Sequence, residues 1–377
     1  MLLSKHFSSF AAALLLTGCM AADPCFDEID PVRTIDTSIT QLSAIGVQDL
    51  NGDGQLDIIA QGSDGEGMYW YEQQDEQFSE HFIIDGLNDG YEIEAADFDR
   101  DGDIDLFVIS DQGKLIYLEQ VKTDGDLVTF EEHELADITC GLYCQIAIAD
   151  FDQNSINDLF VCTATAAHCY LFSFTNDKAL EWSRTELQLY AFYITNLDVI
   201  DANGDAYPDI YYSRYSEYTA GIMLNNQSGG FQLQPRTIPD LYGSTSFADV
   251  TGDGRPDYIT PGGVFGAKNE FIGFDNVFFG LPQSVIGYDV DGDGDNDVLG
   301  STHNGYYLRV NENRVFPREG AKKVTDLDAV YQSNSIARPI LIADVNQDGS
   351  PDLVGDRLLN GKIFWADIPA LCADPVN

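Results

Sequence analysis

The sequence predicts an all-β fold, a seven-bladed β-propeller, on three observations. A nine-residue acidic loop recurs seven times along the 377 residues, with starts 48, 53, 51, 48, 40 and 55 residues apart. A period of about 50 residues is the length of a four-stranded propeller blade rather than of a helical repeat. Short apolar runs separated by Gly, Asn and Asp flank the loops, as is typical of strands and turns. No segment carries a sustained 3.6-residue apolar pattern, so we expect no helical fold.

Each blade is expected to contain four strands, and each acidic loop should join the first two of them. The third strand should follow a Gly-rich turn, and the fourth should be more polar. Expected first strands include residues 92–96 and 340–343, second strands 106–109 and 159–161, third strands 68–71, 115–118, 306–308 and 363–365, and a fourth strand 78–84.

Two blades depart from this plan. The fifth has only 40 residues and leaves little room for its outer strand, which is expected between Phe274 and Leu281. The seventh has three strands and ends soon after Trp365. Residues 33–36 echo residues 236–240, the expected outer strand of the fourth blade. We therefore expect the N-terminal strand to complete the last blade and close the ring, which removes exposed strand edges.

The composition excludes two classes of partner. The chain has 63 Asp and Glu against 19 Lys and Arg, a formal net charge of −44. Such a chain offers no basic stripe for nucleic-acid phosphates and no electrostatic attraction to anionic lipid. Because 44% of the residues are hydrophobic, it can still bury a sizeable core.

The seven loops are residues 49–57, 97–105, 150–158, 201–209, 249–257, 289–297 and 344–352. Each offers side-chain oxygens at positions 1, 3, 5 and 9, and most have Gly at position 6. Alternating hard oxygen ligands around a tight turn suit Ca²⁺, with a backbone carbonyl at position 7. Mg²⁺ is less suited, since it retains its waters. An EF-hand is excluded because no loop has the required Glu at position 12.

The sequence thus predicts up to seven Ca²⁺ ions. We expect the loop at Asp289 to bind most tightly and the loop at Asp150, with Asn154 and Ser155, to bind least; Ala206 also weakens the fourth loop. A solvated acidic turn is the alternative for any single loop, but seven in register disfavour it. The expected ligands are Asp49, Asn51, Asp53, Asp57, Asp97, Asp99, Asp101, Asp105, Asp150, Asp152, Asn154, Asp158, Asp201, Asn203, Asp205, Asp209, Asp249, Thr251, Asp253, Asp257, Asp289, Asp291, Asp293, Asp297, Asp344, Asn346, Asp348 and Asp352.

These loops and strands resemble the FG-GAP/VCBS repeats of integrin-α-type seven-bladed propellers, over residues 31–370. The Phe-Gly…Gly-Ala-Pro signature is poorly kept, so the VCBS-like variant is nearer. The resemblance implies Ca²⁺ between the first two strands of a blade, on one face of the disc. It also implies that a ligand meets the opposite face.

The N-terminus predicts export. Residues 1–18 read as a signal peptide, and Leu16-Thr-Gly-Cys19 resembles a bacterial lipoprotein signal with Cys19 lipidated. Cleavage near Ala21 or Ala22 as an ordinary signal peptide is the alternative. The expected organisation is a tether over 19–30, the propeller over 31–370 and a tail over 371–377. We expect a lipid-anchored protein of the outer membrane or cell surface.

Six cysteines follow Cys19 and, in an exported chain, predict disulfides. One expected pair joins Cys25 to Cys372, although Cys25 staying free is the alternative. For the other four, the favoured pairing is Cys162 with Cys169 and Cys140 with Cys144. The rival is Cys144 with Cys162 and Cys140 with Cys169.

Catalytic signals are weak. His81 and His133 fall on expected outer strands facing solvent, and His168 lies in a turn beside Cys169. His303 is the best lone base candidate, yet a hydrogen-bonded turn residue is its more frequent role. No GxSxG, HExxH or P-loop motif occurs.

Aromatic residues crowd the fourth blade. Inter-blade packing accounts for alternate residues of 207–215, whereas Tyr215 and Tyr218 are the likelier exposed pair. With His303 they form the possible ligand face. The sequence therefore favours a calcium-stabilised surface binding or adhesion propeller that recognises a protein or glycan. The alternatives are a carbohydrate-active enzyme, because some polysaccharide lyases resemble this propeller, and a structural component of an envelope assembly.

Overall fold

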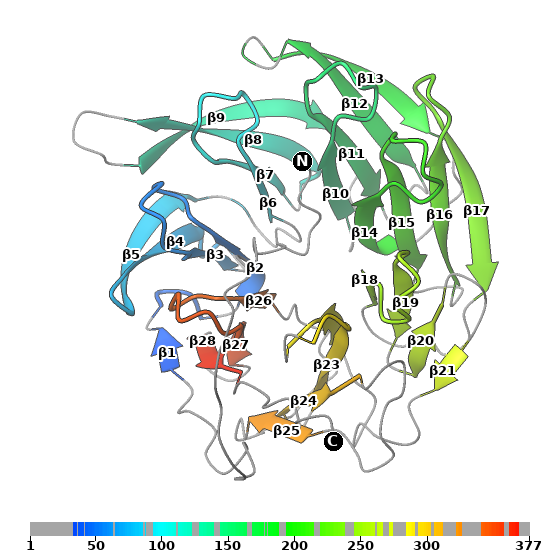
Figure 1. Cartoon of the computed structure of the whole chain (residues 1–377). Helices are drawn as coiled ribbons and strands as arrows, with labels where there is room; N and C mark the ends of the chain where they lie inside the picture. The colour runs from blue at the N-terminus through cyan, green and yellow to red at the C-terminus, as the bar shows by residue number, and fades with distance from the viewer. Residues whose placement is uncertain are drawn as a thin grey trace. The chain divides into compact units, whose positions relative to one another are not determined.

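We describe a computed structural model of the chain, whose strands are labelled in Figure 1. It describes residues 33–35, 37–40, 42–62, 65–85, 87, 93–110, 112–122, 128–138, 144–163, 168–176, 178, 180–187, 194–214, 219–237, 245–260, 262–266, 271–273, 284–290, 293–302, 305–311, 322–325, 341–357 and 362–368. These residues contain seven antiparallel four-stranded sheets and no helix. The fold is an all-β, seven-bladed propeller, as predicted.

The strands divide between two compact units. The first unit holds four consecutive meanders, blades 1 to 4. Their strands are β2 (Leu42–Gln48), β3 (Asp57–Gly62), β4 (Met68–Gln74) and β5 (Gln77–Ile84); β6 (Ile93–Ala96), β7 (Asp105–Ile109), β8 (Lys114–Lys122) and β9 (Val128–Asp137); β10 (Cys144–Ala149), β11 (Asp158–Thr163), β12 (Cys169–Asn176) and β13 (Glu181–Leu187); β14 (Ile194–Ile200), β15 (Asp209–Arg214), β16 (Thr219–Asn225) and β17 (Phe231–Thr237).

The second unit holds blades 5, 6 and 7. Their strands are β18 (Ser246–Ala248), β19 (Asp257–Thr260), β20 (Gly263–Phe265) and β21 (Phe271–Gly273); β22 (Ser284–Tyr288), β23 (Asp297–Thr302), β24 (Gly305–Arg309) and β25 (Lys322–Thr325); β26 (Leu341–Ala343), β27 (Asp352–Arg357), β28 (Lys362–Asp367) and β1 (Arg33–Ile35).

Burial explains the polarity of the strands. The second strands β3, β7 and β11 are buried along their whole length, because each blade packs on both of its faces. Clusters of apolar side chains fill the space between neighbouring blades within each unit. The outer strand β5 has no buried residue, which suits its polar side chains. Tyr211 and Tyr212 are 4% and 0% exposed, so packing is their role.

The seventh sheet takes one strand from the start of the chain. Strand β1 pairs antiparallel with β28, with Arg33 opposite Trp365, so residues 33–35 do supply the outer strand of the last blade. The Arg33 guanidinium lies 4.2 Å from the Trp365 ring centroid and 3.1 Å from an Asp367 carboxylate oxygen. This cation–π contact and ion pair fix the register of the short strand.

The expected outer strand of the fifth blade was placed wrongly. It is β21, at residues 271–273, and not between Phe274 and Leu281. The reason is the short third strand β20, which has three residues, so that the chain returns early and pairs Gly263 with Gly273.

One disulfide of the third blade is described. Cys162 and Cys169 are opposite each other on β11 and β12 and are bonded, as the favoured pairing predicted. Cys144 is also disulfide-bonded, so the rival pairing of Cys144 with Cys162 is wrong. Residues 1–30 and 371–377, with Cys19, Cys25, Cys140 and Cys372, lie outside the described residues.

Candidate metal-binding loops

Each acidic loop joins the first and second strands of its blade, and its ninth residue is the first residue of the second strand. These seven residues, which we call the latch aspartates, are 0–1% exposed. They are Asp57, Asp105, Asp158, Asp209, Asp257, Asp297 and Asp352.

The latch aspartates tie each loop to its blade through backbone hydrogen bonds. In all seven, Oδ2 accepts from the N–H of the second loop residue at 2.7–3.1 Å. In blades 1, 2, 3, 4 and 6, Oδ1 accepts a bond of 2.7–2.8 Å from an N–H on or next to the third strand. Such bonds satisfy backbone donors that burial would otherwise leave unpaired. The loop pattern in the sequence predicts these residues as metal ligands and does not reveal this anchoring role.

The other acidic side chains fold inward over the turn. In the first loop, Asp49 Oδ1 accepts from Gly52 and Asp53, and Oδ2 accepts from Gly54. Asn51 Oδ1 and Asp53 Oδ1 each accept an N–H two residues ahead. The fourth loop repeats this pattern around Asp201. Successive Asx turns of this kind aim several oxygens at the inside of one turn.

The turn requires left-handed backbone at positions 4 and 6. Glycine fills position 6 in five loops. Where position 4 or 6 is not glycine, the residue there still adopts a positive φ. These residues are Arg100 (61°), Gln153 (60°) and Gln347 (58°) at position 4, and Ser155 (71°) and Ala206 (71°) at position 6. Non-glycine residues in this region are uncommon and cost conformational energy.

In two of the loops, among the described residues, carboxylate oxygens from three aspartates lie close together. One carboxylate oxygen from each of Asp97, Asp99 and Asp101 lies within 4.8 Å of the others, and the same holds for Asp150, Asp152 and Asp158. Asp150 Oδ1 is buried and has no hydrogen-bond partner. A buried carboxylate oxygen without a donor is costly unless a cation completes it. The donor set and this oxygen fit a hard divalent cation.

Burial also changes the proton affinity of the loop acids in the metal-free chain. It raises the pKa of Asp57 to about 7, of Asp105 to about 6 and of Asp158 to about 7, although backbone hydrogen bonds oppose the shift. Burial, and then a hydrogen bond with Asp367, raises the pKa of Asp352 to about 8. Burial and the neighbouring Asp101 raise the pKa of Asp99. A bound cation would stabilise the ionised forms.

The described histidines lie outside the acidic loops, although Glu72, the partner of His81, also accepts a hydrogen bond from Asn51 of the first loop. His81 and His133 lie on outer strands, half-buried, and each Nε2 is 2.8 Å from a glutamate of the third strand, Glu72 or Glu119. His168 Nδ1 lies 2.5 Å from Glu186. The residues of the expected ligand face, Tyr215, Tyr218 and His303, lie outside the described residues, as does the expected metal ligand Asp291.

Comparison with protein families supports the sequence interpretation. Residues 49–108, 201–260 and 289–355 match the model of the FG-GAP-like repeat. The chain carries FG-GAP-like repeats. Each matched segment begins at the first residue of an acidic loop and includes the strand that the latch aspartate starts.

Two solved structures show the same fold. One is that of a lectin from Agrocybe aegerita, described as recognising non-reducing terminal N-acetylglucosamine (18% identity, 83% of this chain and 88% of that chain, TM-score 0.57). The other is BBS1N in complex with ARL6DN (12% identity, 90% of this chain and 98% of that chain, TM-score 0.57). No curated protein matches the chain significantly. Within the described residues, no helix could cross a bilayer.

Proposed function

We propose that this protein is a calcium-stabilised binding propeller that recognises a protein or a glycan at the cell surface. The observation that carries the proposal is the set of seven loops in one register, each locked to its blade by a buried latch aspartate. A loop fixed in this way holds its remaining carboxylates close together even though they repel one another. Such an arrangement favours a divalent cation as part of the folded structure.

Calcium fits the loops better than magnesium. Each loop offers oxygen-bearing side chains at four positions, three or four of them carboxylates, together with backbone carbonyls. Ca²⁺ accepts six to eight oxygens in irregular geometry, whereas Mg²⁺ demands an octahedron and keeps its waters. All 28 expected ligands remain in the proposal, with one addition: each latch aspartate also anchors the backbone.

A binding role fits the fold and its relatives. One structural neighbour is a lectin that recognises N-acetylglucosamine, and another was solved with its protein partner ARL6DN. In our proposal the ligand meets the turns opposite the acidic loops, including Tyr215, Tyr218 and His303. Lipidation of Cys19 would hold the propeller at the outer membrane or cell surface.

A glycan array, together with affinity capture from surface extracts, tests the binding role in millimolar Ca²⁺. Replacement of Tyr215 and Tyr218 by Ala should abolish capture of a partner so found, with unchanged thermal melting. Equal loss of binding and of stability would make these tyrosines core residues. Release of unsaturated uronates from polysaccharides, seen by ultraviolet absorbance, would instead support the enzyme alternative.

A further inference from the structure

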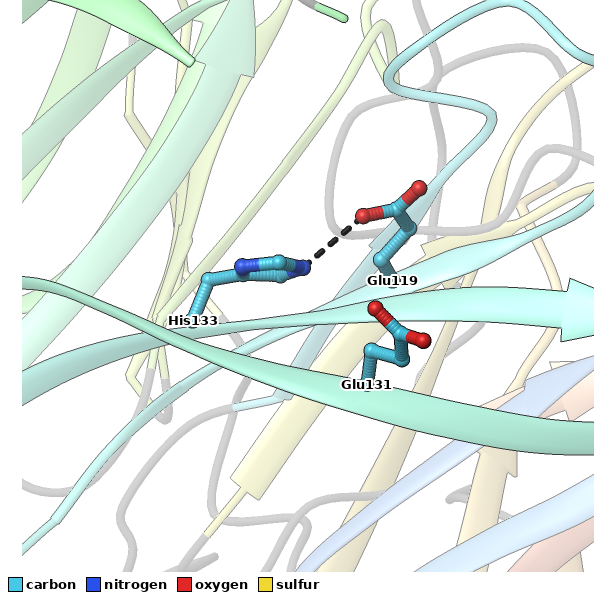
Figure 2. A group of neighbouring side chains, drawn as sticks. All are labelled: Glu119, Glu131 and His133. Atoms are coloured by element: carbon cyan, nitrogen blue, oxygen red, sulfur yellow. Dashed lines mark hydrogen bonds and ion pairs between the residues drawn. The ribbon is translucent and has the colours of Figure 1, made fainter. Parts of the chain in front are cut away.

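A second kind of polar cluster, which includes an imidazole, lies on the third and outer strands of blade 2. It consists of Glu119 on β8 and of Glu131 and His133 on β9 (Figure 2). One ligand atom from each side chain lies within 4.8 Å of the other two. Figure 2 shows both carboxylates and the imidazole directed toward one another.

The strand register brings the three side chains to one face. Glu119 is directly opposite Glu131 in the antiparallel pair, and His133 is two residues further along β9. The His133 ring stacks on Tyr117, with ring centroids 5.6 Å apart and planes inclined by 25°. This contact orients the imidazole so that its Nε2 lies 2.8 Å from Glu119 Oε2. The cluster is thus built by backbone pairing and by packing.

The charges of the cluster favour a further cation. Two carboxylates directly opposite each other on a sheet are destabilising. His133 contacts Glu119 but is a single group beside two acids. The side chains of Glu119 and His133 are each 31% exposed, so an ion can reach them from solvent and retain a water ligand.

Two other blades carry related pairs at the same place. In blade 1, His81 lies 2.8 Å from Glu72 and stacks on Trp70, but the residue opposite Glu72 is Ser79. In blade 7, Arg33 takes the place of the histidine, over Trp365 and beside Asp367. Arginine cannot ligate a metal, because it stays protonated. Of these three blades, blade 2 alone joins a histidine to two carboxylates within the described residues.

We propose that Glu119, Glu131 and His133 bind one divalent first-row transition metal ion, of which Zn²⁺ is the best match. One imidazole and two carboxylates, with a fourth position open to water, form a donor set that suits Zn²⁺, whereas Ca²⁺ prefers oxygens alone. Ligands about 2 Å from a tetrahedral ion stand about 3.3 Å apart. The three ligand atoms already lie within 4.8 Å of one another, so small side-chain rotations can bring them to the spacing of about 3.3 Å.

The test is calorimetric titration of untagged protein with ZnCl₂ in excess Ca²⁺, so that the acidic loops are already saturated. We expect one Zn²⁺ per chain, with at least tenfold weaker binding in Glu131→Ser and in His133→Gln. Glu131→Ser copies the residue that blade 1 carries at this position. The converse variant Ser79→Glu should add a second Zn²⁺ by completing the Glu72–His81 pair.

Three results would overturn the proposal: no Zn²⁺ bound in excess Ca²⁺, unchanged affinity in Glu131→Ser, or no added ion in Ser79→Glu. Thermal melting of each variant in Ca²⁺ controls for folding, since all three positions lie on outer strands. Visible absorption of the Co²⁺-loaded protein gives an independent readout. Tetrahedral d–d bands should appear in the unmodified chain and disappear in His133→Gln.

Discussion

The first and third acidic loops follow the same backbone path with different residues at the turns. The first has Gly52 and Gly54 at positions 4 and 6, with φ of 75° and 90°. The third has Gln153 and Ser155, with φ of 60° and 71°. In both loops the latch aspartate accepts one bond from the second loop residue and one from the third-strand side of the sheet. The comparison teaches that the latch, more than glycine, fixes the path of the loop.

The first residue of the loop differs between the two. Asp49 uses both oxygens to accept three backbone N–H groups. Asp150 accepts one from Ser155 through Oδ2, while its Oδ1 is buried without a partner. The third loop therefore has a strained turn, which weakens an ion site, and an unsatisfied oxygen, which an ion would satisfy.

Removal of calcium from the acidic loops should cause the largest loss of stability. Ligand binding to the native state adds about 4 kcal/mol for a site at a thousandfold excess over its Kd. With several sites emptied, we expect Tm to fall by about ten degrees or more in excess chelator, measured by calorimetry. Millimolar Ca²⁺ should restore the Tm and equimolar Mg²⁺ should not. Unchanged melting in chelator would contradict the calcium proposal.

Replacement of a latch aspartate should cause the next largest loss of unfolding free energy, and the loss should be similar in the first and third loops. Asp57→Ala and Asp158→Ala each leave two buried backbone N–H groups unpaired, which costs roughly 2–4 kcal/mol. Urea unfolding should show this loss both in Ca²⁺ and in chelator. The matched control is Asp53→Ala, an exposed ligand position, which should lower stability in Ca²⁺ and have little effect in chelator, because the Gln55 N–H that it accepts is exposed and can bond to water. A loss confined to Ca²⁺ in the latch variants would make them ligands and not anchors.

Substitutions at position 6 of the two turns should change the unfolding free energy by smaller amounts, with opposite signs in the two loops. Ser155→Gly should stabilise the chain by about 1 kcal/mol, because glycine adopts positive φ without strain. Gly54→Ala should destabilise it by a similar amount. A Cβ at Gly54 would meet no atom within 4 Å, so only conformational strain is involved. Denaturant midpoints in chelator measure both; a stabilising Gly54→Ala would refute the strain argument.

A further expected effect is a pH dependence of the stability of the metal-free protein. Burial raises the pKa of Asp57 and of Asp158 from 3.8 to about 7. A raised folded-state pKa contributes stability that is complete below about pH 4 and is lost as pH rises through about 7. Metal-free protein should therefore unfold in less urea at pH 8 than at pH 5. With Ca²⁺ the trend should reverse, because the ion needs ionised carboxylates.

The repeat made most of this fold predictable from sequence. The spacing of the acidic loops fixed the number of blades, and the echo of residues 236–240 in residues 33–36 led to the pairing of β1 with β28. Both inferences depend on local composition, which a sequence displays directly. The outer strand of blade 5 was misplaced because β20 is only three residues long, so the chain turns back earlier than the longer third strands of other blades suggest.

The residues of the acidic loops could be predicted from the sequence. Which of them act as ligands and which also anchor the backbone could not. An Asp at position 9 reads as a ligand, yet it starts a buried strand, and its oxygens face backbone N–H groups. The presence of Asp at position 9 in every loop does not separate the two roles, because position 1 is also Asp in every loop. The Glu119–Glu131–His133 cluster depends on strand register, which the sequence leaves open by two or more residues.

The pairing of β1 with β28 has a consequence for synthesis of the chain. Arg33 and Asp367, which bond across this pair, are 334 residues apart. A ribosome adding about 5–20 residues per second needs roughly 20–70 s to deliver the second after the first. Blades 1 to 6 use consecutive strands and can assemble in order as they emerge. The seventh waits for β28 (Lys362–Asp367), and a nascent chain released before that strand would expose β27 as an open edge for pairing with another chain.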